Sequence, residues 1–275
     1  PDVFITEFAN ATGWVHAGDK AIAGRLVKTN DEHPLVAQIW GGEPGDMEQF
    51  AAHCAKLGFD GIDINMGCPA KSAIKSGGAA LIHRPDVAVA AIAAAKTAGL
   101  PVSVKTRLGY TYIDEWREWL STLLTQNLAN LTIHLRTKKE MSKVPAHHEL
   151  IDDIIKLRDE IAPQTLLTIN GDIRNRVHGE ELFRAHPGLN GIMIGRGVFS
   201  DPFCFACTGA RASQKTIRDP QSQPRFFLKR HLRRCLELSR YTLLPPTAPE
   251  STSSYPRRCA RAALPLRLRA NQYSR

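Results

Sequence analysis

Cys68 is the residue of this sequence whose type and setting best suit it to take part in chemistry. It follows residues 61–65 (GIDIN), where apolar and polar residues alternate as in a short buried strand. Gly67 permits a tight turn before the cysteine, and Pro69 stiffens the chain after it. We therefore expect a thiol held on a rigid edge that faces whatever the strand ends surround. An isolated cysteine is more often a small, inert core residue, so its role depends on its neighbours.

Polar residues also lie at or near the ends of other predicted strands. They are Glu7, Gln38, Asn65, Lys105, His134 and Asn170. A lone lysine or histidine at a strand end is more often solvated or internally satisfied. If the strands are parallel, however, their ends meet at one edge, where such side chains can hold a ligand and move protons.

The elements that must position these residues follow an alternating pattern. Strands are predicted at residues 3–7, 34–40, 61–65, 102–106, 131–134, 166–170 and 191–194. Helices are predicted at 46–57, 85–98, 113–126, 147–161 and 175–185, with a mixed segment at 11–28 and a glycine-bearing loop at 71–84. This alternation is typical of a parallel sheet with crossover helices, either an open doubly wound sheet or a closed barrel. The polar strand ends favour an α/β (β/α)8 TIM barrel with its chemistry at the C-terminal mouth.

The two ends of the sequence depart from this pattern. Only seven strands are legible, so we expect the barrel to lack its first strand, which would lie upstream of Pro1, and to have open edges. We place the catalytic barrel at residues 1–207 and a basic C-terminal segment at 208–275. Within that segment only residues 226–238 (FFLKRHLRRCLEL) have helical spacing, and the rest has no convincing periodicity.

Charge is distributed unevenly along the chain. The net charge is +9, but residues 206–275 hold 13 Arg and 2 Lys against 1 Asp and 2 Glu, a charge of +12, which leaves −3 for residues 1–205. The basic end suits a polyanion, or is simply a charged unstructured tail.

Six irregularly spaced cysteines favour free thiols in a reducing cytoplasm over disulfides. The sequence has no apolar run long enough to predict a membrane span. It also has no second cysteine pair with the spacing of a zinc site, so we expect no metal site.

Several motifs, in this order, resemble the tRNA-dihydrouridine synthases, flavin enzymes that reduce uridine in transfer RNA. The resemblance covers roughly residues 3–205. Its specific parts are IDINMGCPAK at 62–71, SGGAAL at 76–81, VSVKTRLGY at 102–110, LTIHLRT at 131–137, INGDI at 169–173 and GIMIGRGVFSDPFCF at 191–205. Weaker support comes from ITE at 5–7 and VAQIWG at 36–41.

The resemblance implies an FMN cofactor across the barrel mouth. Gln38, Lys105 and His134 would lie by the flavin ring. The residues expected toward the ribityl phosphate are Asn170, Gly171, Asp172, Gly195 and Arg196. Loops after the last barrel strands often bind phosphate, and an arginine suits phosphate oxygens, which supports this placement.

The resemblance also implies the reaction. Hydride from reduced FMN would reach C6 of uracil, and Cys68 would be the catalytic acid that protonates C5. A thiol can serve because it is largely protonated at neutral pH. Asn65 would hold the uracil, while Arg107 and Arg136 would be electrostatic partners of substrate carbonyls or RNA phosphates. NADPH is the expected reductant, tRNA the partner, and the protein is expected to be a cytoplasmic monomer.

Two departures leave alternatives open. The Pro-Met-Ala-like flavin-contacting segment that normally begins such proteins is absent, and their C-terminal helical domain has no clear counterpart beyond residues 226–238. The basic end could be a remnant of that domain or an out-of-frame product. One alternative function is an FMN barrel acting on a free pyrimidine, as in dihydroorotate dehydrogenases. Another is a degenerate, non-enzymatic chain.

Overall fold

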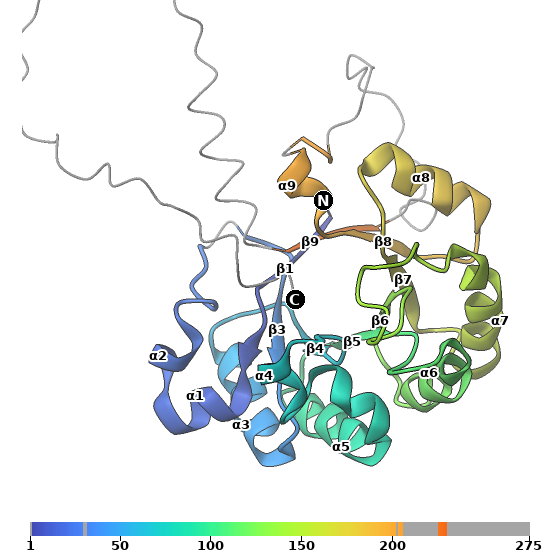
Figure 1. The fold of residues 1–275 in the computed structure, drawn as a ribbon. Helices are drawn as coiled ribbons and strands as arrows, with labels where there is room; N and C mark the ends of the chain where they lie inside the picture. Colours follow the sequence, from blue (N-terminus) through green and yellow to red (C-terminus); the bar gives the residue numbers. More distant parts are fainter. Residues whose placement is uncertain (1, 30–31, 202, 206–224, 230–275) are drawn as a thin grey trace, which may run out of the picture. The chain divides into compact units, whose positions relative to one another are not determined.

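Eight parallel strands form a closed ring in the computed structural model, which describes residues 2–29, 32–201, 203–205 and 225–229 (Figure 1). The strands are β1 (Val3–Ile5), β3 (Leu35–Trp40), β4 (Gly61–Asn65), β5 (Val102–Arg107), β6 (Asn130–His134), β7 (Leu166–Asn170), β8 (Gly191–Ile194) and β9 (Arg225–Lys229). They pair in the order β1-β9-β8-β7-β6-β5-β4-β3, and a further β1–β3 pairing closes the ring. The short β2 (Ala9–Asn10) pairs with the end of β3.

Helices surround this ring and connect its strands (Figure 1). In chain order they are α1 (Ala11–Ala17), α2 (Asp19–Ile22), α3 (Pro44–Lys56), α4 (Lys71–Ile74), η1 (Gly78–His83), α5 (Pro85–Lys96), η2 (Ile113–Glu115), α6 (Trp116–Leu124), η3 (His148–Leu150), α7 (Ile151–Ile161), α8 (Arg176–Ala185) and α9 (Gly197–Ser200). Each strand in the ring pairs with its neighbours in parallel. The predicted (β/α)8 TIM-barrel class is confirmed.

The prediction of two open barrel edges is wrong for this structure. The strand β9 lies between β8 and β1, with Ile192 opposite Phe226 and Val3 opposite Phe227. Residues 225–229 are therefore a strand, where we expected a helix from residue 226. Backbone groups on the edges of β8 and β1 gain partners this way, and the adjacent phenylalanines suit a strand. Residues 230–238 lie outside the described residues, and the division between residues 207 and 208 stays a prediction.

The segment predicted as a glycine-bearing loop, residues 71–84, contains α4 and the 3-10 helix η1. Periodicity over so short a stretch gave no clear sign of them. Three apolar side chains of this segment, Ala79, Leu81 and Ile82, are buried in the core, and this burial fixes the local backbone.

The two faces of the barrel strands differ in chemistry. One face carries apolar side chains such as Ile62, Ile64 and Leu131, which belong to the core that includes the helices. The other face, which lines the ring, is mostly polar between β3 and β7, with a small apolar cluster of Ile5 and Met193. No buried side-chain nitrogen or oxygen among the described residues lacks a hydrogen-bond partner. A polar lining is therefore tolerated because its groups satisfy one another.

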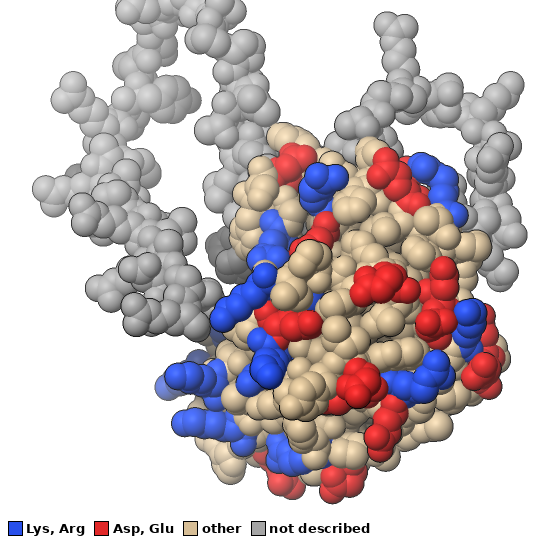
Figure 2. All heavy atoms as spheres, turned by 45° about the vertical axis from the view of Figure 1, so that its right-hand side comes forward, with Lys and Arg blue, Asp and Glu red and all other residues tan. Residues whose placement is uncertain are grey.

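Acidic side chains lie among basic ones over the face of the barrel shown in Figure 2. This mixture agrees with the charge of −3 expected for residues 1–205. Within the described part of the chain no single helix is long and apolar enough to cross a membrane. The bent pair Lys71–His83 and Pro85–Lys96 passes that test by length and composition alone.

Candidate functional site

Polar residues at the ends of β4 to β7 lie side by side at the C-terminal mouth of the barrel. Asn65 is the register partner of Lys105, and His134 is the partner of both Arg107 and Asn170. The parallel strands bring these residues together because equivalent positions share one edge of the ring. This is the edge at which barrel enzymes place their chemistry.

The Cys68 loop is held by its own strand. The Asn65 Oδ1 atom accepts hydrogen bonds from the backbone N–H groups of Gly67 (3.2 Å) and Cys68 (2.9 Å). The Cys68 carbonyl accepts from the Ala79 N–H at 3.0 Å. Gly78 has a φ of 57°, and a Cβ there would lie 2.8 Å from the Cys68 oxygen, so only glycine fits. Cys68 is thus half-buried on a loop fixed from both sides.

The other described cysteines are not comparable candidates. Cys54 and Cys204 are buried. Burial raises the pKa of the Cys54 thiol to about 12 and that of Cys204 to about 11. Both are therefore core thiols of the inert kind. Cys207, the partner of Cys204 in the C-x-x-C pattern, lies outside the described residues. Among those residues no group of three or more His, Cys, Asp or Glu side chains could hold a metal ion.

Arg107 ties the Cys68 loop to the loop after β6. It is 6% exposed. Its Nε donates to the Gly67 carbonyl at 2.8 Å, and its Nη1 donates to the carbonyls of Thr137 (3.0 Å) and Met141 (3.2 Å). Burial lowers the pKa of Arg107 to about 10, so it remains a cation at neutral pH. The structure therefore shows Arg107 as an anchor of two mouth loops, and its predicted role toward substrate stays a prediction.

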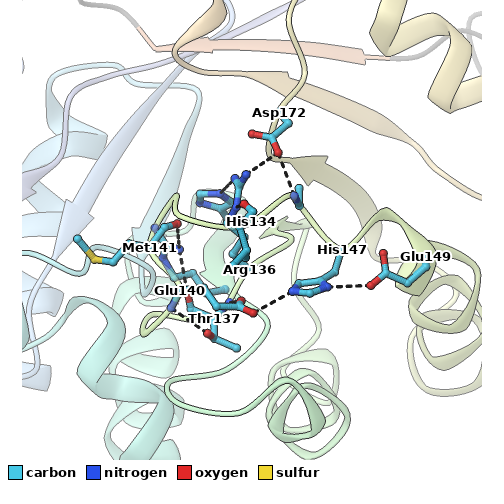
Figure 3. Close-up of polar contacts among 11 residues, drawn as sticks. His134, Arg136, Thr137, Glu140, Met141, His147, Glu149 and Asp172 are labelled. Carbon is cyan, nitrogen blue, oxygen red and sulfur yellow. Dashed lines mark hydrogen bonds and ion pairs between the residues drawn. The ribbon is translucent and has the colours of Figure 1, made fainter.

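Arg136 has a similar position on the loop after β6 (Figure 3). It is 2% exposed, and its Nε donates to the Val144 carbonyl at 2.6 Å. Its Nη1 lies 3.1 Å from His134 Nε2, and its Nη2 forms an ion pair with Asp172. The Asp172 carboxylate also accepts from the Ala146 N–H at 2.9 Å. Arg136 therefore joins β6, its loop and the end of β7.

His134 is a neutral imidazole in this setting. Burial lowers its pKa, and so do the charges of Lys105, Arg107, Arg136 and Arg196. Because an arginine only donates, His134 Nε2 must accept from Arg136, which leaves the ring proton on Nδ1. The side chain can thus donate one hydrogen bond from Nδ1 without carrying charge.

Lys105 and Asn170 are linked across β6. The Lys105 Nζ donates to Asn170 Oδ1 at 3.1 Å, and Asn170 Nδ2 donates to the Met193 carbonyl at 2.9 Å. Both side chains are half-buried. The ammonium group is therefore fixed by the strand-end layer while remaining partly open to the mouth.

The predicted phosphate residues occupy the neighbouring loops after β7 and β8. The side chain of Arg196 is 71% exposed, and its Nη2 lies 3.9 Å from Asp172 Oδ1. Gly171 has a φ of 125°, a conformation that favours glycine, and its carbonyl lies 3.1 Å from His148 Nε2. Asn170, Gly171, Asp172, Gly195 and Arg196 therefore meet on one side of the mouth, and their role toward phosphate stays a prediction.

Gln38 lies deeper than we expected for a residue at the flavin ring. It is fully buried, with its Nε2 donating to Asp63 Oδ2 at 2.6 Å and its Oε1 accepting from Asn65 Nδ2 at 3.1 Å. In this structure Gln38 supports Asn65 from below. A contact with a cofactor at the mouth would require it to become accessible.

Sequence reasoning missed a second set of residues near the mouth. His147 lies between two carboxylates, with Nε2 3.0 Å from Glu140 and Nδ1 2.8 Å from Glu149 (Figure 3). Glu140 also accepts from the Thr137 N–H at 2.7 Å. No motif signalled this cluster, because its members are separated by seven and two residues on a loop without periodicity.

The mouth residues fit an anionic, planar ligand. Four cations, Lys105, Arg107, Arg136 and Arg196, act on the same point at His134. Such convergence favours phosphate and negative charge on a ring. Half-buried polar groups at Lys105 and Asn170 can bind the edge of a planar heterocycle. These residues, with the loops after β7 and β8, could therefore hold an anionic, planar cofactor.

The chain is similar to known proteins along most of its length. The family model described as dihydrouridine synthase (Dus) matches residues 2–244. "Probable tRNA-dihydrouridine synthase 2" of Bacillus subtilis (strain 168) is 55% identical over 221 residues, 80% of this chain and 68% of that protein. "Probable tRNA-dihydrouridine synthase" of Staphylococcus aureus (strain Mu50 / ATCC 700699) is 54% identical over 221 residues, 80% of this chain and 67% of that protein. Among solved structures, a variant of NCR from Zymomonas mobilis aligns with 15% identity and a TM-score of 0.48, covering 71% of each chain.

The structure is a parallel barrel with a polar, cationic mouth. Barrels of this class are typically enzymes whose active site lies at that mouth. The sequence matches identify the family of enzymes. The chain belongs to the dihydrouridine synthase family, a family of flavin-dependent oxidoreductases.

Proposed function

We propose that this chain reduces a uridine of tRNA to 5,6-dihydrouridine, with FMN as cofactor and NADPH as reductant. Support comes from its membership of the dihydrouridine synthase family and from relatives more than half identical to it that carry the name tRNA-dihydrouridine synthase. The observation that carries the proposal is the position of Cys68. It is half-buried at the barrel mouth on a fixed loop, next to Asn65 and to the Arg107 cation.

In this proposal Cys68 is the acid. FMN, when bound, supplies the hydride for C6 of the uracil. The Cys68 thiol gives its proton to C5 from the opposite face. The Asn65 side chain accepts from the Cys68 backbone N–H, and in this proposal Asn65 also holds the uracil. Because the loop is anchored at Gly67 and at Ala79, the thiol needs little reorganisation before proton transfer.

The remaining predicted residues have roles around that step. Lys105 and His134 face the flavin ring, with Gln38 beneath them. The residues assigned to the ribityl phosphate are Asn170, Gly171, Asp172, Gly195 and Arg196. Arg107 and Arg136 shape the mouth through their loops and add positive charge that attracts the RNA backbone. We also propose that the protein acts as a monomer in the cytoplasm.

The test is a comparison of the full chain with Cys68→Ala and Cys68→Ser. Each protein is titrated with FMN, reduced with NADPH under anaerobic conditions, and given an unmodified tRNA transcript. We expect flavin binding and flavin reduction to be unchanged and uridine reduction to slow by about 10²–10⁴-fold in both variants. Cys68→Ser separates loss of the acid from loss of side-chain volume.

Three outcomes would contradict the proposal. A variant that forms dihydrouridine at the rate of the unmodified chain removes Cys68 from the acid role. Reduction of free uracil or oxidation of dihydroorotate without activity on tRNA supports the free-pyrimidine alternative. A chain that stays colourless after FMN titration supports the non-enzymatic alternative.

A further inference from the structure

We propose that Asp63 is a positioning residue that sets the orientation of two side-chain amides and thereby holds the Cys68 loop in place. It acts through Gln38 and Asn65 and touches no substrate itself. The inference concerns the loop geometry on which the proposed function rests. It is tested on the chain without flavin or RNA, so it can fail or succeed independently of that function.

The residues involved form one layer of the barrel lining below the mouth. Asp63 on β4 is the register partner of Gln38 on β3 and of Ser103 on β5. The Ser103 Oγ donates to Asp63 Oδ1 at 2.6 Å, and the Gln38 Nε2 donates to Asp63 Oδ2 at 2.6 Å. Asn65 stands two residues further along β4, on the same face and one layer nearer the mouth.

The direction of each hydrogen bond in this layer determines the direction of the next one, as far as the Cys68 loop. A carboxylate accepts and does not donate, so Gln38 must turn its NH₂ toward Asp63. Its oxygen is then the acceptor for Asn65 Nδ2 at 3.1 Å. With its NH₂ used in this way, Asn65 presents its oxygen to the backbone N–H of Cys68 at 2.9 Å. Each amide has one satisfying orientation, and Asp63 decides it.

Burial makes this polarity costly to violate. Asp63 and Gln38 are fully buried, and Asn65 is 5% exposed. Bulk water cannot replace a lost partner at these positions, so a wrongly turned amide would place two donors or two acceptors face to face. The side-chain amides of Gln38 and Asn65 therefore each keep one orientation, which is set by Asp63.

The single change Asp63→Asn should disturb the loop while keeping the side-chain shape. The introduced amide can donate to Gln38 and turn it over, which points the Gln38 NH₂ at the Asn65 NH₂. Asn65 then turns as well and no longer accepts from Gly67 and Cys68. We expect the backbone amides of residues 67 and 68 to exchange with solvent at least about tenfold faster, the loss of roughly one hydrogen bond.

A polarity swap is the sharper variant. In the double change Asp63→Asn with Asn65→Asp, the introduced amide donates to Gln38, and the introduced carboxylate accepts from Gln38, Gly67 and Cys68. Every group keeps a partner, with the direction of the relay reversed and the net charge unchanged. We expect this swap to restore slow exchange at residues 67 and 68.

Thr168→Val is the matched control. Thr168 is a buried polar residue of the same barrel lining, on β7, and its Oγ1 donates to Asn130 Oδ1 at 2.8 Å. Its loss removes a buried hydrogen bond far along the sheet from Cys68. Exchange at residues 67 and 68 should be unchanged in this variant, even if global stability falls.

Hydrogen exchange of the flavin-free full chain, followed for individual amides, decides the matter. Fast exchange in Asp63→Asn, slow exchange in the swap and slow exchange in Thr168→Val support the proposal. Exchange in Asp63→Asn equal to that of the unmodified chain overturns it, as does a swap that fails to restore protection. If Asp63→Asn alone does not fold, the swap decides, because the proposal requires it to fold with both amides protected.

Discussion

Buried arginines hold loops at both ends of the barrel, but the consequences differ between the two ends. At the mouth, Arg107 and Arg136 donate to loop carbonyls after β4 and β6. At the opposite end, Arg158 of α7 donates to the carbonyls of Thr165 and Gly188, before β7 and β8. All three are less than 7% exposed. Hydrogen bonds from a buried arginine to loop carbonyls thus occur both at the end of the barrel that carries the candidate site and at the end where loops only connect helices to strands.

This comparison shows that a buried arginine does not mark an active site by itself. Arg158 also donates to Asn190 Oδ1 and to Asp159 Oδ1, each at 2.6 Å, and its partners in the described part of the chain include no thiol and no histidine. At the mouth, a half-buried thiol and a neutral imidazole lie beside the arginines. In barrels the C-terminal edge carries chemistry and the N-terminal edge carries stability. The predictions below test that division.

The largest effect on folding is expected from Arg158→Met. Four acceptors, the carbonyls of Thr165 and Gly188 and the side chains of Asn190 and Asp159, would lose their donor. We expect the free energy of unfolding to fall by about 3–5 kcal/mol, with turnover per folded molecule nearly unchanged. Urea unfolding and activity at low temperature measure the two quantities. Arg184→Met, at an exposed ion pair with Glu180, is the control and should change stability by less than about 1 kcal/mol.

Arg107→Met should show the reverse pattern. Thr137 is fully buried, but water at the mouth can reach the freed carbonyl of the half-buried Met141, so stability should fall by only about 1–3 kcal/mol. Loss of the tether to Gly67 should displace the Cys68 loop and slow turnover by about 10–100-fold. The same two measurements apply. If Arg107→Met and Arg158→Met gave equal ratios of stability loss to activity loss, the division between the ends would be refuted.

A smaller, pH-dependent effect is expected from His147. Burial lowers its pKa, but hydrogen bonds and charge from Glu140 and Glu149 outweigh burial and raise the pKa above its ordinary value. Because folding raises this pKa, the ion pairs of His147 with Glu140 and Glu149 contribute their full share of the free energy of unfolding at pH values below the ordinary histidine pKa. That contribution is lost as the pH rises through the raised pKa. NMR titration of the ring should show the raised pKa. Glu140→Gln should lower it more than Glu149→Gln, since Glu140 is the more buried partner.

The smallest effect is expected from two lysines at the rim, of which Lys138 is half-buried and Lys139 is exposed. Lys138 and Lys139 lie over the rings of Tyr110 and Tyr112, at 4.5 and 5.5 Å, on loops next to the mouth. If either contacts an RNA phosphate, its change to Gln should reduce the slope of log K against log salt by about 0.7–0.9. Filter binding of a tRNA transcript at several salt concentrations measures the slope. Lys156→Gln, on the outer surface of α7, should leave it unchanged; an equal change there would show a nonspecific charge effect.

The predictions made from sequence were best where periodicity and burial agree. The strands β4, β7 and β8 have the predicted bounds, because apolar residues pack on the helices at every second position. The helical spacing of residues 226–238 predicts a helix there, and this prediction is wrong for residues 226–229, which belong to β9. Pairing on both sides with β8 and β1 decided otherwise, and such pairing cannot be read from a local pattern.

The amino-acid sequence by itself determined the class of fold, the family, and the set of strand-end residues that meet at the mouth. It could do so because strand alternation and motif order are local properties. Only the tertiary structure decided what each of these side chains contacts. It buries Gln38 beneath Asn65, turns Arg107 and Arg136 toward loop carbonyls, and places His147 between Glu140 and Glu149. Hydrogen-bond partners come from strands and loops 25 to 40 residues apart or from irregular loops, so they are fixed by how the ring closes rather than by spacing in the chain.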